Sequence, residues 1–562
     1  MASLLFVVYA DTQGLNRLHV HRSSMLTITQ DGRNAVRSPT GSHVAYSTPD
    51  NVRIYDVQRR NLSELPCETK GLQSLRWLSD PDLLALVYDS RVDIISVDRV
   101  GPRFRIANGS KPLGSITTVK QLSSRQILVA WEFGRARIYD LAAGRHIDLG
   151  DFKTACDGAS HAIRPNRPDG VQLFAYLRKD GAEEALCIRT DTGAVVKQTK
   201  LQTTDAQSVS WSSNGNWLAV LDAPISSTGV GLYVYTADGN RFVTYPRSPH
   251  KWPNELGIKD FAWSPGAGGC LALASHSGDV VMLNTKTFLP NATLEHTPNV
   301  VQDATSDGEM PVWNEVVSAS GERAYEMGHW PASPVLTRAK APTDPKELGI
   351  SEMCFNASGT MLATRDERFQ STLWIWSTGT SYGRDCAVQS LILQHRNIRK
   401  VSWHPNDPSM VMFDCGEANM YLYNTHLPDT PPMVMNVPIP GNVGLHWVST
   451  GGDSDEVVIL ATTKSRWCVL YPERDPNDEV QDVDHKQQTV TIGEESHLED
   501  SLFEVLSCRK PTTKAATSYT ERIDMEAESD MTGRLDDTFR EKRKPAATSA
   551  EVDPFEDDSQ IF

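Results

Sequence analysis

The sequence predicts an all-β fold, a β-propeller of about nine degenerate four-stranded units, on three observations. A unit of several short strands recurs along most of the 562 residues, with a period of about 40–45 residues. Each clear unit ends its first alternating strand in Trp or Phe, and a turn and then an aliphatic strand follow. The aromatic anchors keep the period, since Trp77 and Trp211 lie 134 residues apart, about three units, and Trp403 and Trp447 lie 44 apart. Short strands at such a period are typical of propellers.

The units follow one another from near Val36 to residue 472. The clearest read LQSLRWLS at 72–79, AQSVSWSSNG at 206–215, LGIKDFAWSP at 256–265, LGISEMCFNASG at 348–359 and IRKVSWHPNDP at 398–408, and weaker ones begin near Val36, Val119, Ala162 and Val443. One unit cannot bury both of its faces alone, whereas units stacked in a ring bury a continuous core. Nine units exceed the four to eight blades typical of a propeller. We therefore expect either a single large ring, or seven to eight blades with extra strands packed alongside.

The repeat divides the chain into five segments. Residues 1–34 form an irregular N-terminal segment, which could supply a closing outer strand, and 35–284 hold units one to six. Residues 285–347 form a long insertion with seven prolines, which we expect to be mostly loop. Units seven to nine occupy 348–472, and an acidic tail covers 473–562.

The charge of the chain is concentrated in the tail. Residues 473–562 hold 24 acidic and 11 basic residues, a net charge of −13, while the other 472 residues have a net charge of −3. The tail is poor in aromatic residues and is expected to be disordered, because it cannot bury enough apolar area to offset its ordering entropy. The nearly neutral body lacks the basic field that nucleic-acid binding requires. No apolar run approaches the roughly 18 residues that cross a membrane.

The sequence gives no indication of catalysis. Motifs of the HExxH, GxSxG, P-loop and EF-hand kinds are absent, and the nine cysteines include no CxxC pair. His395, His404 and His446 are interpreted as structural, because no carboxylate or cysteine recurs near them at ligand spacing. We predict that the chain is not an enzyme and has no catalytic residues, no cofactor and no metal.

The candidate binding residues lie on loops. In a propeller, the loops that enter a blade and the turns between its second and third strands emerge on one face. The entry loop HKWPNELGIK carries Trp252, and turns of the second kind carry Asp222 and the pair Arg365 and Asp366. An aromatic residue surrounded by charges is a candidate interaction hot spot. In the tail, four apolar residues at helical spacing could dock in a partner's groove: Leu498, Leu502, Phe503 and Leu506.

Several strings resemble the WD-repeat protein eight family, in a fungal-type member. They are LQTTDAQSVSWSSNGNWLAVLD, LYVYTADGNRFVTY, LGIKDFAWSP with LALASHSGDVVMLNTKTF, and LGISEMCFNASGTMLATRDE with LWIW. The match covers roughly 35–470 and includes the long insertion between the units at 256–284 and 348–376. The resemblance implies a WD-repeat scaffold in the cytoplasm and cytoskeleton, at the spindle pole body or centrosome. It implies a coiled-coil anchoring adaptor and a minus-end-directed kinesin-fourteen motor as partners, which together anchor microtubule minus ends. It supplies no catalytic residues.

Other functions stay open on the residues alone. A translation-initiation or ribosome-associated propeller is the main alternative, although RNA binding calls for basic stripes that the body lacks. A substrate receptor of a ubiquitin ligase would be expected to end a blade in a motif that no unit here shows. We expect no contact with nucleic acid or membrane. We also expect no direct microtubule binding, because the acidic tail would be repelled by the acidic surface of tubulin.

Overall fold

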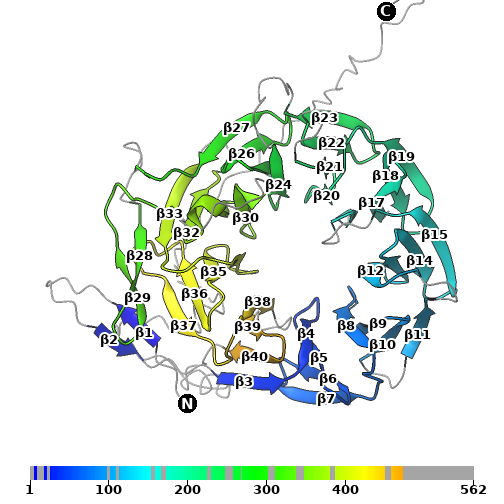
Figure 1. The fold of residues 1–562 in the computed structure, drawn as a ribbon, viewed down its shortest axis with the longest axis horizontal. Coiled ribbons are helices and arrows are strands. Elements are labelled where there is room, and N and C mark those ends of the chain that lie inside the picture. Colours follow the sequence, from blue (N-terminus) through cyan, green and yellow to red (C-terminus); the bar gives the residue numbers. More distant parts are fainter. Residues whose placement is uncertain are drawn as a thin grey trace, which may run out of the picture. The chain divides into compact units, whose positions relative to one another are not determined.

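The computed structural model contains a ring of nine mainly antiparallel sheets (Figure 1). The innermost strands surround the centre of the ring, which we call the central channel. It describes residues 5–8, 18–21, 26–80, 82–97, 102–108, 113–153, 159–165, 172–224, 230–246, 257–266, 269–301, 310–336, 347–379, 386–449 and 457–471. The nine sheets, numbered here as blades 1 to 9 in chain order, correspond to the nine repeat units, so the single large ring is confirmed.

Blades 1 to 6 each take four successive strands, the first at the channel and the fourth at the rim. Blade 1 holds β4 (Arg33–Arg37), β5 (His43–Ser47), β6 (Val52–Asp56) and β7 (Asn61–Leu65), and blade 2 holds β8 (Leu72–Trp77), β9 (Leu83–Tyr88), β10 (Arg91–Ser96) and β11 (Pro102–Ala107). Blade 3 holds β12 (Ile116–Ser123), β13 (Gln126–Trp131), β14 (Arg135–Asp140) and β15 (Arg145–Asp151), and blade 4 holds β16 (His161–Ile163), β17 (Leu173–Asp180), β18 (Glu183–Thr190) and β19 (Val195–Lys200). Blade 5 holds β20 (Ser208–Trp211), β21 (Trp217–Leu221), β22 (Leu232–Thr236) and β23 (Arg241–Tyr245), and blade 6 holds β24 (Ile258–Trp263), β25 (Cys270–Ser275), β26 (Asp279–Asn284) and β27 (Pro290–Glu295).

The last three blades include the departures from this pattern. Blade 7 holds β30 (Ile350–Phe355), β31 (Met361–Asp366), β32 (Thr372–Ser377) and β33 (Ala387–Leu393), with the short 3-10 helix η3 (Glu367–Phe369) and a hairpin of β28 (Val312–Val317) and β29 (Arg323–Met327). Blade 8 holds β34 (Lys400–Trp403), β35 (Met410–Asp414), β36 (Asn419–Asn424) and β37 (Met433–Asn436). Blade 9 holds β38 (Gly444–Ser449), β39 (Val457–Thr462), β40 (Arg466–Tyr471) and β3 (Leu26–Asp31), while β1 (Leu5–Val8) and β2 (Leu18–His21) form a separate two-stranded sheet.

The ring is closed by a strand from the N-terminal segment. The strand β3 pairs antiparallel with β40, from Leu26 opposite Tyr471 to Asp31 opposite Arg466, and so becomes the outer strand of the last blade. At the same seam, the Tyr471 hydroxyl donates to the carbonyl of Val57 at 2.8 Å and lies 3.0 Å from the Tyr55 hydroxyl. Closure protects the first and last blades from exposing an unpaired sheet face.

The core consists of nine apolar clusters, and each fills the interface between two neighbouring blades. The second and third strands supply most of it, because their aliphatic runs are buried on both faces, as in LLALVY of β9 and MVMFD of β35. The cluster at the seam joins Tyr46 of blade 1 to Trp467 of blade 9, with ring centroids 5.0 Å apart. Stacking of degenerate blades therefore produces one continuous core.

The repeated tryptophans link the innermost strands of neighbouring blades. Four of them donate their indole N–H to a backbone carbonyl of the preceding blade's first strand: Trp77 to Val36 at 3.0 Å, Trp211 to Ala162 at 3.3 Å, Trp403 to Cys354 at 3.0 Å and Trp447 to Ser402 at 3.3 Å. Blade 1 has Arg37 at this position, and its guanidinium donates to the carbonyl of Trp447 at 2.5 Å. The anchors of the repeat are thus core residues that fix the ring around the channel.

We predict that Trp403→Phe lowers the free energy of unfolding by about 1 kcal/mol more than Trp263→Phe does. Both substitutions shrink an aromatic ring at the end of an innermost strand. Only Trp403 loses a hydrogen bond, because the Trp263 indole N–H has no partner within the described residues. Urea unfolding of the two variants measures the difference, and equal losses would show that the indole bond contributes nothing.

Most described residues of the segment 285–347 lie outside strands, but the segment also forms three strands that the sequence analysis did not expect. It contains β27, the outer strand of blade 6, and the hairpin of β28 and β29. The strand β28 pairs in parallel with β33, placing Val312 opposite Leu391, and so widens blade 7 to six strands. The prolines of this segment are compatible with these strands, because proline is excluded from strand interiors but not from their ends. Pro290 is the first residue of β27, and Pro311 directly precedes β28.

Candidate protein-interaction face

One face of the ring carries the turns after each second strand and the loops that enter the next blade, and we call it the loop face. The turns after each first and third strand lie on the opposite face. An open depression of about 910 Å³ lies on the loop face across blades 3 to 6. It is lined by Phe133, Lys153, Lys179, Asp205 and Gln207, among others. The loop face is where the sequence analysis placed its candidate residues.

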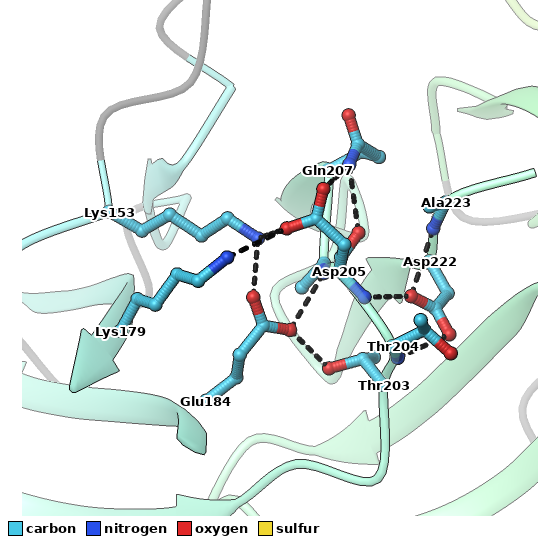
Figure 2. Close-up of polar contacts among 10 residues, drawn as sticks. Lys153, Lys179, Glu184, Thr203, Thr204, Asp205, Gln207, Asp222 and Ala223 are labelled. Carbon is cyan, nitrogen blue, oxygen red and sulfur yellow. Dashed lines mark hydrogen bonds and ion pairs between the residues drawn. The ribbon is translucent and has the colours of Figure 1, made fainter. Parts of the chain in front are cut away.

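A buried ion pair joins Lys153, which lines this depression, to Glu184 of blade 4 (Figure 2). The Lys153 ammonium is 2.5 Å from Oε1 of Glu184, and both side chains are largely buried, at 11% and 3% exposed. The other carboxylate oxygen of Glu184 accepts from the Ala206 N–H and the Thr203 hydroxyl, each at 2.7 Å. With its oxygens satisfied in this way, the charge of Glu184 is held in place by partners from two blades.

Asp205 also lines the depression, and its side chain is about half-exposed. Its carboxylate lies 2.7 Å from the Lys153 Nζ and 3.3 Å from the Lys179 Nζ, and Gln207 donates to it at 2.8 Å. Burial acts to raise the pKa of Asp205, but the hydrogen bonds and charges of the two lysines outweigh it and hold that pKa below its usual value. Asp205 is therefore ionised at neutral pH and forms a fixed negative point between two cations.

We predict that Asp205→Asn lowers stability by less than about 1 kcal/mol at pH 7, since half-exposed pairs are screened by solvent. A carboxyl group with a depressed pKa stabilises the fold above its unfolded pKa of about 3.9, and this contribution is lost as the pH falls through the folded pKa. The difference between the parent and Asp205→Asn should therefore shrink below about pH 4. Urea midpoints at several pH values test this, and a difference independent of pH would contradict it.

Asp222 shapes the loop that carries Asp205. Its buried carboxylate accepts the backbone N–H groups of Thr204 at 2.9 Å, Asp205 at 2.8 Å and Ala223 at 2.9 Å (Figure 2). An aspartate directly after the strand WLAVL can bond nearby backbone groups in this way. The sequence analysis gave Asp222 as a candidate partner-binding residue, and in the structure its buried carboxylate positions the entry loop of blade 5.

Phe133 is the exposed aromatic of the depression, and the sequence analysis missed it. It lies in the turn between β13 and β14 and is 70% exposed. The next residue, Gly134, has φ +75°, and a Cβ there would lie 3.0 Å from the carbonyl of Phe152, so the turn needs glycine. The string Glu-Phe-Gly at the end of a second strand is the signal that could have identified it.

Arg365 and Asp366 lie on the loop face at blade 7, away from the depression. Asp366 is fully buried, and its carboxylate caps η3 and pairs with Arg368 at 2.6 Å. Arg365 donates to the Ser351 hydroxyl at 2.7 Å and to the carbonyl of Ile398 in the next blade. Both side chains are thus engaged within the ring, and any contact with a partner would have to come from the loops that they hold.

The other candidates cannot be placed. Trp252 and the tail residues Leu498, Leu502, Phe503 and Leu506 lie outside the described residues. Their role in partner binding stays a prediction.

The three histidines differ in their surroundings. His404 is buried, and its Nδ1 accepts the N–H groups of Asn406 and Asp407, which fixes a turn. The backbone of His395 donates to Glu315 at 2.8 Å. His446 lies on the innermost strand β38. Within the part of the chain that the structure describes, no three His, Cys, Asp or Glu side chains gather as a metal site would require, and no helix is long and apolar enough to span a membrane.

Comparison with known proteins gives a relative of the same repeat class. No model of a protein family matches the chain. An uncharacterized WD repeat-containing protein of Schizosaccharomyces pombe is 28% identical over 322 residues, which are 55% of this chain. The match spans 61% of the length of that protein.

Solved structures show a similar fold at low identity. A eukaryotic initiation factor gives a TM-score of 0.48 with 10% identity, covering 79% of this chain and 97% of that one. The Dos1 propeller gives a TM-score of 0.41 with 10% identity, covering 74% of this chain and 95% of that one. Neither likeness carries a functional argument. The nine blades and the fungal relative together describe a propeller of the WD-repeat type, a class of scaffold that generally mediates contacts between proteins.

Proposed function

We propose that the chain is a non-enzymatic scaffold that binds protein partners through its loop face and acts at the spindle pole body or centrosome. The observation that carries the scaffold function is the depression on the loop face, where exposed Phe133 stands beside the fixed charges of Lys179 and Asp205. Hot spots of protein interfaces have this composition, an aromatic anchor surrounded by polar groups. A ring with a continuous core holds such a surface rigid, which lowers the entropic cost of binding.

The place of action rests on the resemblance of the repeat strings to the WD-repeat protein eight family. We propose a coiled-coil anchoring adaptor and a minus-end-directed kinesin-fourteen motor as partners, in an assembly that anchors microtubule minus ends. The nearly neutral body and the tail charge of −13 support contact with microtubules through these partners, because tubulin also presents an acidic surface.

Live imaging of the tagged chain through mitosis, with affinity capture from the same cells, tests this proposal. The expected result is a focus at the spindle poles and recovery of a coiled-coil protein with a minus-end-directed kinesin. A diffuse signal with ribosomal proteins in the capture would overturn it in favour of a translation scaffold. Co-sedimentation of the purified chain alone with microtubules at physiological salt would contradict the indirect contact.

A further inference from the structure

The innermost strands around the central channel carry mostly positive side chains on one side of the ring and the carboxylates on another. The innermost strands of blades 9, 1, 2 and 3 contain no carboxylate, but they carry four cations: Arg33 and Arg37 of β4, Arg76 of β8 and Lys120 of β12. The innermost strands of blades 6 and 7 carry the carboxylates Asp260 and Glu352, and that of blade 6 also carries Lys259. One side of the channel wall is therefore positive.

Two of these cations occupy equivalent places in neighbouring blades. Arg76 precedes Trp77, and Lys120 precedes Gln121, whose side chain likewise reaches back to the preceding blade and accepts the Asp80 N–H at 2.8 Å. Because side chains alternate along a strand, Arg76 and Lys120 point the same way on adjacent strands. The Arg76 guanidinium also spans the gap between them, donating to the Thr117 carbonyl of β12 at 3.0 Å.

The positive charge of this wall is not compensated within the described residues. Neither Arg76 nor Lys120 forms an ion pair there, and burial alone lowers the pKa of both groups. Arg37 donates to a backbone carbonyl. Burial, and then the charges of Lys400 and Arg37, lower the pKa of His446 on the same wall to about 4. Half-buried Arg76 and exposed Lys120 therefore present positive charge without a counter-charge, which favours an anionic ligand.

The last described strand of the propeller, β40 of blade 9, ends beside the positively charged blades. Tyr471 ends β40, the third strand of blade 9, so the chain emerges on the face opposite the loop face. The strands β4 and β8 end at that same face, which places Arg37 and Arg76 at its channel mouth. Tyr471 itself contacts blade 1 through the carbonyl of Val57. The segment that follows, 473–500, contains ten acidic and two basic residues.

We propose that the acidic segment 473–500 of this chain docks against the cationic wall formed by Arg37, Arg76 and Lys120. The 13 residues from Tyr471 to Asp484 span up to about 43 Å when extended, so the acidic residues are not confined to the end of β40. The segment acts as an internal ligand of this wall. This inference does not depend on where in the cell the chain acts.

Acetylation of Lys120 in the purified full chain tests the proposal. The parent is compared with a variant in which Asp475, Asp478, Glu479, Asp482 and Asp484 become Asn or Gln. A matched control changes five distal acidic residues in the same way: Glu551, Asp553, Glu556, Asp557 and Asp558. N-hydroxysuccinimide acetate is the probe, peptide mass spectrometry follows its rate of reaction, and exposed Lys464 provides the internal reference.

The expected result is labelling of Lys120 that is about fivefold slower in the parent and the distal control than in the proximal variant. Salt at about 0.5 M should abolish the difference, because it screens the contact. Equal labelling of the parent and the proximal variant would overturn the proposal. Slow labelling that persists in the proximal variant and disappears after nuclease treatment would also overturn it, because the ligand would then be a bound nucleic acid. The salt titration needs only the parent, so the test holds even if a variant folds poorly.

Discussion

Replacing Arg323 by alanine is expected to lower the free energy of unfolding by about 3–5 kcal/mol. Its partner Glu315 has a fully buried side chain, which accepts from the Arg323 guanidinium at 2.8 Å, the Tyr421 hydroxyl at 3.0 Å and the His395 N–H at 2.8 Å. Removing the guanidinium leaves a buried carboxylate without its counter-charge. Equilibrium urea unfolding of the variant and the parent measures this difference in the free energy of unfolding.

Arg396→Ala is the matched control for this prediction. Arg396 is 64% exposed and pairs with Glu417 at 3.1 Å, so its loss should cost less than about 1 kcal/mol. Combining Arg323→Ala with Glu315→Gln should recover part of the loss, because glutamine brings no charge into the interior. If Arg323→Ala and Arg396→Ala were equally mild, the hairpin would not be fixed by the buried pair.

The second large effect is expected on binding. We predict that Phe133→Ala reduces recovery of the partner proteins at least about tenfold, since truncating a hot spot costs 2 kcal/mol or more. The stability of the ring should change little because the Phe133 side chain is 70% exposed. Quantitative affinity capture from mitotic cells, normalised to the amount of tagged chain, gives the measurement.

Phe242→Ala is the control on the other face. Phe242 is 52% exposed near the turn between β22 and β23, opposite the loop face. Its replacement should leave recovery within about twofold of the parent, as expected for a residue outside the hot spot. The reverse pattern, with recovery lost in Phe242→Ala and kept in Phe133→Ala, would move the interaction surface to the opposite face.

The sequence predicted the repeats better than the insertion for a physical reason. Each blade is a run of short local hairpins, so strings such as QSVSW followed by WLAVL show both the strands and the turn between them. The hairpin of β28 and β29 depends on parallel pairing of Val312 with Leu391, which is 79 residues away. Nothing local in the string VWNEVV indicates that partner.

The candidate site was predicted only in its location. The rule that second-to-third turns emerge on one face led to the loop face, where Asp222 and Asp366 lie. This rule does not distinguish a carboxylate that points to solvent from one that accepts hydrogen bonds from nearby backbone groups. In the structure the side chains of Asp222 and Asp366 are both buried. Phe133 and the Lys153–Glu184 pair were missed, because their roles depend on loops from three different blades.

A hydrogen-exchange footprint of the partner on the full chain tests most directly the claim that the loop face is the binding surface. When the captured adaptor is bound, exchange is expected to slow in 132–134, 179–181 and 203–207, which surround the depression. No change is expected in the turns 212–216 and 237–240 on the opposite face. Protection confined to those opposite turns would show that the partner does not bind the loop face.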